Sequence, residues 1–143
     1  MSTIRNVSLS AIASGSYVHP DNAVLIQIVD PCYQFPLPKH HFEAVHQFEF
    51  LDVEAKDTKF DDFKITQEQA AEIVRILQSA LDQNQNVIVH CHQGLCRSGA
   101  VADVGVMMGF QDTQARRIPN LLVKSMLMKE LNVSWYDSIP SEG

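Results

Sequence analysis

The stretch VIVHCHQGLCRSG, residues 87–99, contains the strongest indications of the fold and of the functional site. Residues 87–90 are apolar or β-branched up to a histidine and predict a buried strand. Residues 98–109, SGAVADVGVMMG, are almost entirely apolar and predict a buried helix. The seven residues from Cys91 to Arg97 join this strand to this helix. Ligands of open α/β sheets bind beyond the carboxyl ends of the strands, so we expect a functional site in this loop.

The rest of the chain predicts further strands and helices around that loop. Residues 23–29 (AVLIQIV) and residues 46–53 (HQFEFLDV) predict strands. Residues 66–82 predict a helix, because Thr66 is a suitable N-cap and Gln69 stands where a capping box needs it. A last helix is expected to open near Pro119.

Strands alternate with helices along the chain, and this order predicts an α/β fold. We expect one domain over residues 1–143, with a central, mostly parallel sheet flanked by helices. The loop from Cys91 to Arg97 then lies between a strand and a buried helix.

The composition limits the partners that the protein can have. The net charge of −6 disfavours nucleic acid, whose binding depends on neutralising a polyanionic backbone. No apolar run approaches 18 residues and no apolar segment follows the N-terminus, so we expect neither a membrane span nor a signal peptide. The three cysteines form no disulfide framework, which favours a reducing, cytoplasmic location.

The loop has the features of a phosphate-binding site. The first N–H groups of a helix lack partners inside it, and the helix dipole is positive at that end. Gly94 allows a tight path, and the guanidinium of Arg97 can grip two phosphate oxygens. The expected phosphate-binding residues are His92, Gln93, Gly94, Leu95, Cys96 and Arg97.

Cys91 would stand at the floor of this positively polarised loop. Such surroundings lower the pKa of a thiol, and a thiolate that faces a phosphate is a nucleophile that faces an electrophile. We therefore predict in-line attack on phosphorus and a phosphocysteine intermediate, with Arg97 stabilising the equatorial oxygens. Ser98 is expected to hydrogen-bond the sulfur and help it leave. His90 is expected to support the loop from behind.

The residues HCHQGLCRS resemble the His-Cys-x5-Arg-Ser/Thr signature of the protein tyrosine phosphatase superfamily. The small size resembles a compact dual-specificity-type phosphatase, and the resemblance covers residues 46–109 well and residues 1–45 loosely. It implies a cysteine-dependent phosphomonoester hydrolase without a cofactor. The implied substrate is a phosphorylated protein or peptide, on tyrosine and also on serine or threonine.

The resemblance also implies a general acid, an aspartate on a loop some 30–40 residues before the cysteine. The loop offers Asp52, Asp57, Asp61 and Asp62. The stretch FLDVEAKDTKF resembles dual-specificity enzymes in which the aspartate precedes a threonine, and this match favours Asp57, 34 residues before Cys91. Asp52 is the alternative because it stands at the end of a predicted strand.

Several other interpretations stay open at this point. The chain could be a catalytically weak module that binds phosphorylated residues, or a phosphatase of a phosphoinositide or an RNA 5′-phosphate. Other thiolate-loop enzymes, such as sulfurtransferases and arsenate reductases, are disfavoured by the position of the cysteine. A zinc site is not expected, because neighbouring residues at His90, Cys91 and His92 point to opposite faces of a strand. Cys96 could form a disulfide with Cys91 or simply pack under the loop.

Overall fold

The computed structural model describes the backbone of residues 1–138 and the side chains of residues 1–132. The strands are β1 (Thr3–Ser8), β2 (Ala23–Val29), β3 (Ala44–Glu49), β4 (Asn86–Cys91) and β5 (Gln111–Asp112). The α-helices are α1 (Leu9–Ser14), α2 (Gln67–Asp82), α3 (Arg97–Met108) and α4 (Leu121–Ser138), and a 3-10 segment, η1, spans Thr58–Phe63.

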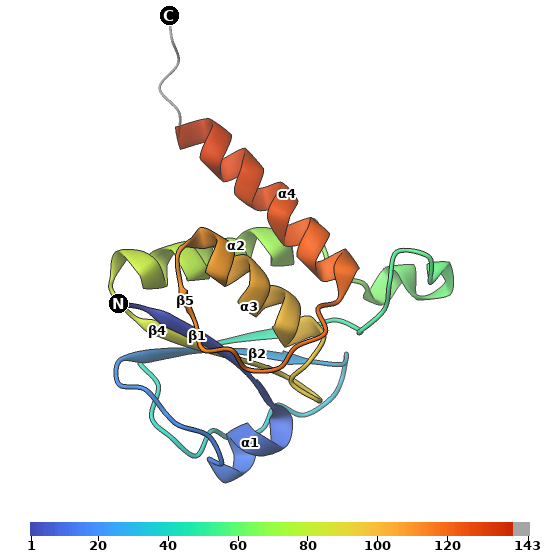
Figure 1. Ribbon diagram of the computed structural model, residues 1–143. Helices are drawn as coiled ribbons and strands as arrows, with labels where there is room; N and C mark the ends of the chain where they lie inside the picture. The colour runs from blue at the N-terminus through green and yellow to red at the C-terminus, as the bar shows by residue number, and fades with distance from the viewer. Residues whose placement is uncertain (139–143) are drawn as a thin grey trace, which may run out of the picture.

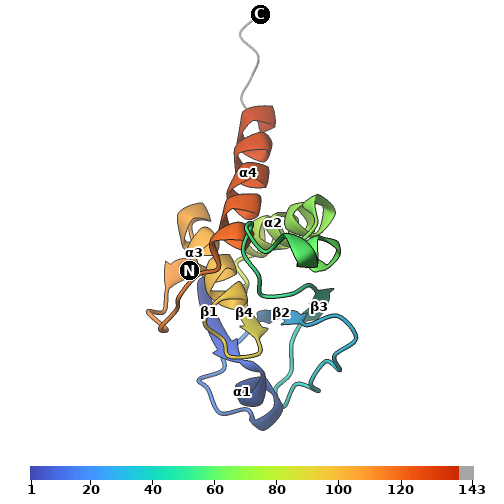
Figure 2. The same cartoon turned by 90° about the vertical axis from the view of Figure 1, so that its right-hand side faces the viewer.

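The five strands form one parallel sheet in the order β3-β2-β4-β1-β5. Helices α2, α3 and α4 lie on one face of this sheet, whereas α1 and two long loops lie on the other (Figures 1 and 2). The α/β fold expected from the sequence is therefore confirmed. Because β4 is the central strand, Cys91 stands at the carboxyl edge of the middle of the sheet.

Each face of the sheet packs a hydrophobic core. The larger core lies under α2, α3 and α4 and includes Ile26, Leu77, Val89, Val101 and Leu127, all fully buried or nearly so. Burial of apolar surface on this scale is the main force that holds the helices to the sheet. No helix in the described part of the chain is long and apolar enough to cross a bilayer.

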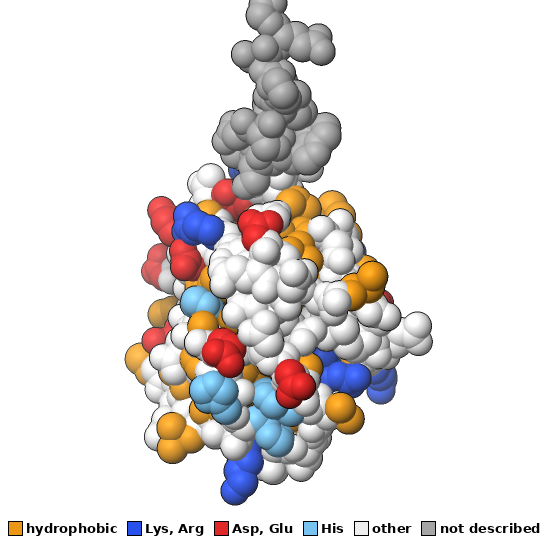
Figure 3. All heavy atoms as spheres, turned by 90° about the vertical axis from the view of Figure 1, so that its left-hand side faces the viewer, with side chains coloured by type: hydrophobic (Ala, Val, Ile, Leu, Met, Phe, Trp, Pro, Cys, Tyr) orange, Lys and Arg blue, Asp and Glu red, His pale blue; other side chains and the backbone are white. Residues whose placement is uncertain are grey.

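The second core lies under α1 and the loop before β3. Ile12 and Phe42 pack there on Leu25 and Ile88 of the sheet. Histidine side chains gather on the face drawn in Figure 3. The rings of His19 and His40 stack with their centroids 4.5 Å apart, beside Phe42 and Tyr17. Burial raises the pKa of Tyr17 to about 12.

Most elements lie where the sequence predicts them. Strand β2 has the predicted bounds, and the capping box of Thr66 and Gln69 is present at the start of α2. Strand β3 ends at Glu49, earlier than predicted, and α4 begins two residues after Pro119.

Strand β1, helix α1 and strand β5 are not predicted. Strand β1 reads TIRNVS, and its polar residues hide the periodicity of a buried strand. Strand β1 and helix α1 contact the site loop through Asn6 and Leu9, so part of the support of the predicted site is not predicted either.

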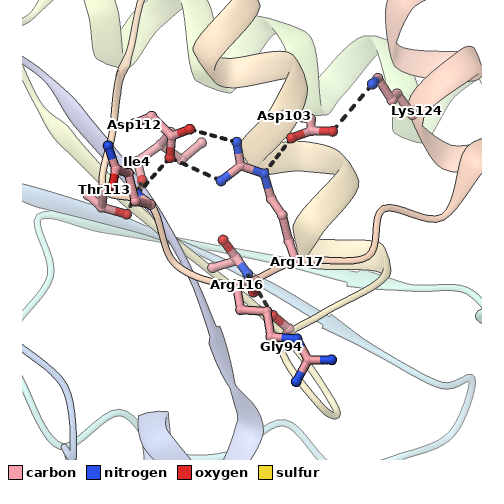
Figure 4. Close-up of polar contacts among 10 residues, drawn as sticks. Ile4, Gly94, Asp103, Asp112, Thr113, Arg116, Arg117 and Lys124 are labelled. Carbon is pink, nitrogen blue, oxygen red and sulfur yellow. Dashed lines mark hydrogen bonds and ion pairs between the residues drawn. The ribbon is translucent and has the colours of Figure 1, made fainter.

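The segment between β5 and α4 is held by an ion-pair network (Figure 4). Arg117 donates to Asp103 of α3 and, through Nη1 and Nη2 at 3.0 Å each, to the carboxylate of Asp112. Lys124 of α4 completes the network at 3.3 Å from Asp103. The network explains an acidic residue on an otherwise apolar helix, and it fixes residues 113–119 beside the site loop.

Candidate active site

Cys91 lies at the bottom of a cleft at the carboxyl edge of the sheet. Its side chain is 3% exposed. The cleft has a volume of about 390 Å³. It is lined by Asp30, which follows β2, by the end of β4 and the site loop, and by the segment after β3: Asp30, Leu51, Asp52, Val53, Phe60, Cys91, His92, Gln93, Cys96 and Arg97.

The carbonyl groups of the site loop are bonded on the side away from this cleft. The carbonyl of His92 accepts from Leu9 N at 3.1 Å, and that of Gly94 accepts from Asn6 Nδ2 at 2.7 Å. The carbonyls of Leu95 and Cys96 accept from the backbone N–H groups of Ile118 at 2.9 Å and Asn120 at 3.0 Å. In a trans peptide the next N–H points opposite to the carbonyl, so these bonds direct several N–H groups toward the cleft. The result is a nest for an anion.

The N-terminus of α3 strengthens the nest. Cys96 is the N-cap of this helix, and its side chain makes no capping hydrogen bond. The first N–H groups of α3 are therefore available to a ligand, and the dipole of a helix of 12 residues favours an anion there.

Arg97 is the first residue of α3 and is 4% exposed. Its Nη1 donates to Asp30 Oδ1 and to the carbonyl of Phe50, at 2.7 Å each. Its buried Nε has no hydrogen-bond partner among the described residues. A buried guanidinium N–H without a partner is costly, and a phosphate oxygen would satisfy it. Asp30 thus fixes the orientation in which Arg97 can bind an anion.

Ser98 and His90 both contact Cys91. The Oγ of Ser98, fully buried, is 3.1 Å from Cys91 Sγ, as the predicted role of Ser98 requires. His90 is also fully buried, and its Nδ1 lies 3.2 Å from the carbonyl of Cys91. Burial, together with the charge of Arg97, lowers the pKa of His90 to about 4. His90 is therefore a neutral residue behind the loop at physiological pH.

The two candidate acids have different surroundings. Asp52 lines the cleft, and its Oδ1 accepts from Asn120 Nδ2 at 2.7 Å. Asp57 is not among the lining residues; its Oδ2 accepts from Glu54 N at 2.8 Å and closes the turn before η1. The geometry thus brings the alternative, Asp52, toward Cys91, and leaves the favoured Asp57 in a structural contact.

Cys96 faces the same cleft. Burial, the charge of Asp52 and a hydrogen bond with Asp52 raise the pKa of the Cys96 thiol. Cys96 is therefore protonated at neutral pH and can donate to Asp52. Cys32, Cys91 and Cys96 are all free thiols.

Three residues of the site are missing from the sequence analysis: Asp30, Asn6 and Asn120. Asp30 had a usable signal, because it directly follows the buried strand β2 at the same sheet edge as Cys91. Asn120 is the N-cap of α4, where Val123 N donates to its Oδ1 at 2.9 Å. Asn6 belongs to a strand that the sequence pattern did not predict.

Comparisons with known proteins show the family and the fold of the chain. Residues 36–109 match the family model described as "Tc-R-P: Polymorphic toxin system, DSP-PTPase phosphatase", and the chain belongs to this family of phosphatases. Among curated proteins, nothing matches.

Solved structures of dual-specificity phosphatases share the fold. Human DUSP28 has a TM-score of 0.62 at 17% identity, with 94% of this chain and 95% of that chain covered. A mouse putative dual specificity phosphatase complexed with zinc tungstate has a TM-score of 0.54 at 18% identity, with 85% and 77% covered.

The tight path at Gly94 gives a first prediction. Gly94 has φ +77°, and a Cβ there would lie 2.4 Å from the carbonyl carbon of Val7. Gly109 also has a positive φ, +129°, but a Cβ there meets nothing within 4 Å. We expect Gly94→Ala to lower the free energy of unfolding by about 2 kcal/mol more than Gly109→Ala, measured by urea denaturation. Equal losses would mean that the loop can move away from β1.

The buried His90 gives a second prediction. Its pKa is about 4 in the folded protein and 6.5 ordinarily, so between these values the unfolded chain binds a proton that the folded chain does not. Stability therefore falls as the pH falls, by about 2 kcal/mol from pH 7 to pH 5 for this residue. The side-chain amide of an asparagine at position 90 can keep the hydrogen bond that His90 Nδ1 makes with the carbonyl of Cys91.

We expect His90→Asn to remove this part of the acid sensitivity, measured by urea denaturation at both pH values. His41→Asn is the control, because it removes an exposed histidine whose side chain is 83% accessible. If His90→Asn remains as acid-sensitive as the unmodified protein, another group causes the loss.

Proposed function

We propose that the protein hydrolyses phosphomonoesters through a phosphocysteine intermediate, and that its substrate is a phosphorylated protein or peptide. One observation carries this proposal. Cys91 Sγ lies at the bottom of a cleft whose loop carbonyls are bonded outward, beside an arginine with an unpartnered buried Nε. A dianionic phosphate satisfies both features.

In the proposed first step, the thiolate of Cys91 attacks phosphorus in line with the leaving oxygen. The S–P bond forms as the P–O bond breaks, and Asp52 gives its proton to the leaving oxygen. The loop N–H groups and Arg97 hold the charge of the equatorial oxygens throughout. Asp52 suits this role because it lines the cleft and because Asn120 fixes its carboxylate.

In the proposed second step, a water attacks the phosphocysteine. Asp52, now a carboxylate, takes the proton of this water, and the S–P bond breaks to release phosphate. The hydroxyl of Ser98, 3.1 Å from Sγ, stabilises the departing thiolate. The cycle ends with Cys91 as a thiolate and Asp52 protonated. A thiolate nucleophile requires a reducing compartment, which favours the cytoplasm.

The residues that line the sides of the cleft favour a phosphopeptide as substrate over a molecule with several phosphates. Leu51, Val53 and the half-exposed Phe60 provide apolar surface for the ring of a phosphotyrosine. Arg97 is the only Lys or Arg among the described residues that line the cleft, which also contains Asp30 and Asp52. A substrate with neighbouring phosphates, such as a phosphoinositide, would meet these carboxylates without further cations.

The first test of the proposal is hydrolysis of para-nitrophenyl phosphate in EDTA. We expect turnover by the unmodified protein and a loss of kcat on the order of 10³-fold or more in Cys91→Ser, because serine is a much weaker nucleophile. Cys32→Ser is the matched control, since Cys32 lies in an exposed loop. Binding of a phosphopeptide without turnover would instead indicate a phosphoresidue-binding module.

The assignment of the general acid gives a separate prediction. On a phosphotyrosine peptide, whose leaving group needs a proton, Asp52→Asn should lower kcat about 100-fold. Asp57→Asn should change kcat less than about threefold, because its carboxylate only closes a turn. On para-nitrophenyl phosphate the difference should shrink. The opposite order of effects would return the role to Asp57.

A further inference from the structure

Asn6 is an unusual residue in its position on β1. Its side chain is 4% exposed, on a strand whose neighbour two residues earlier, Ile4, is 1% exposed and apolar. Its Oδ1 is buried and has no hydrogen-bond partner among the described residues. A leucine would fill a similar volume without leaving a buried carbonyl unpaired. The reason for an amide must therefore lie in the two hydrogen bonds that it donates.

Both of these bonds end at the phosphate-binding loop or beside it. Asn6 Nδ2 donates to the carbonyl of Gly94 at 2.7 Å and to the carbonyl of Arg116 at 2.9 Å. Figure 4 shows Gly94 and Arg116 side by side. One amide group thus joins β1, the crest of the loop and the segment that leads to α4. The next residues of that segment, Ile118 and Asn120, hold the carbonyls of Leu95 and Cys96.

Asn6 differs from the other groups that orient the loop. The carbonyls of His92, Leu95 and Cys96 accept from backbone N–H groups, which a change of side chain other than to proline leaves in place. Within the described part of the chain, two side chains donate to a loop carbonyl: His90 to that of Cys91, at the start of the loop, and Asn6 to that of Gly94, at its tight turn. Asn6 holds the peptide that joins Gly94 to Leu95, and in that peptide the N–H lies opposite to the carbonyl.

We infer that Asn6 is a positioning residue for oxyanion binding. It holds the Gly94–Leu95 peptide in the orientation that presents the Leu95 N–H to the equatorial oxygens of a bound phosphoryl group. Without it, the Gly94 carbonyl is free to turn, and a carbonyl oxygen that faces the cleft repels the anion. The inference rests on the proposed function for the reaction, but it concerns oxyanion affinity, which can be measured without turnover.

The experiment measures the dissociation constant of tungstate by calorimetry and kcat/KM on para-nitrophenyl phosphate, both at pH 6.5. We expect Asn6→Leu to weaken tungstate binding and to lower kcat/KM, each about tenfold or more. Asn86→Leu is the matched control, because the Asn86 amide, at the other end of β4, also joins separate segments: it accepts from Thr3 N of β1 at 2.9 Å and donates to the carbonyl of Asp21 at 2.8 Å. It should lower the melting temperature and leave tungstate binding unchanged.

A second variant covers the case in which Asn6→Leu does not fold. In Asn6→Asp, a protonated carboxyl can still donate to Gly94, whereas a carboxylate repels both carbonyls. Its tungstate affinity relative to the unmodified protein should therefore fall as the pH rises from 5 to 7.5. A purely structural residue would not give this dependence.

The outcomes separate this inference from the proposed function. If the unmodified protein binds tungstate but hydrolyses nothing, the proposed hydrolysis fails, and the affinities of the variants still test Asn6. If Asn6→Leu and Asn6→Asp lose stability yet bind tungstate within about twofold of the unmodified protein at every pH, Asn6 has only a structural role. If the unmodified protein does not bind tungstate, both proposals are overturned.

Discussion

The carbonyl oxygens of His92, Gly94, Leu95 and Cys96 each accept a hydrogen bond from a donor outside the loop, and this orientation is the constraint on which the site depends. A short loop that curls around a helix N-terminus would otherwise be free to turn some of its peptide groups over. A single reversed peptide would place a partial negative charge where the proposed substrate needs a hydrogen-bond donor. The proposed roles of Cys91 and Arg97 both require that these peptides keep their orientation.

The donors come from distant parts of the chain, and this couples the site to the whole fold. Asn6 and Leu9 belong to β1 and α1, while Ile118 and Asn120 lie between β5 and α4. Asn120 serves three segments, because it caps α4, donates to the carboxylate of Asp52 and bonds the loop at Cys96. The start of α4, the loop and the segment after β3 meet at one end of the sheet (Figure 2). A change at the base of α4 therefore reaches both the anion nest and the candidate acid.

The sequence predicts the centre of the site better than its supports. Strand β4, the loop and α3 are continuous in the chain, so periodicity and the glycine reveal them together. Asp30 could also be predicted, because it is the first residue after β2 and the carboxyl ends of parallel strands meet at one edge of the sheet. Asn6 and Asn120 could not be predicted, because their roles depend on contacts with residues 88 and 68 positions away in the chain. No local pattern in TIRNVS distinguishes a buried amide that holds a loop from a polar residue that faces water.

The candidate acid shows why local resemblance and sheet geometry can point to different residues. The resemblance favours Asp57 because it precedes a threonine, but a residue several positions past the end of a strand has no fixed distance from the edge of the sheet. Asp52 stands three residues after the end of β3, beyond Phe50, whose carbonyl accepts from Arg97 and whose N–H donates to Val29. The ion pair of Arg97 with Asp30 and this bond to Phe50 therefore set the position of Arg97 and of the chain that carries Asp52 together. In the proposed reaction, the distance between the group that binds phosphate and the group that protonates the leaving oxygen therefore depends on the hydrogen bonds of one buried guanidinium.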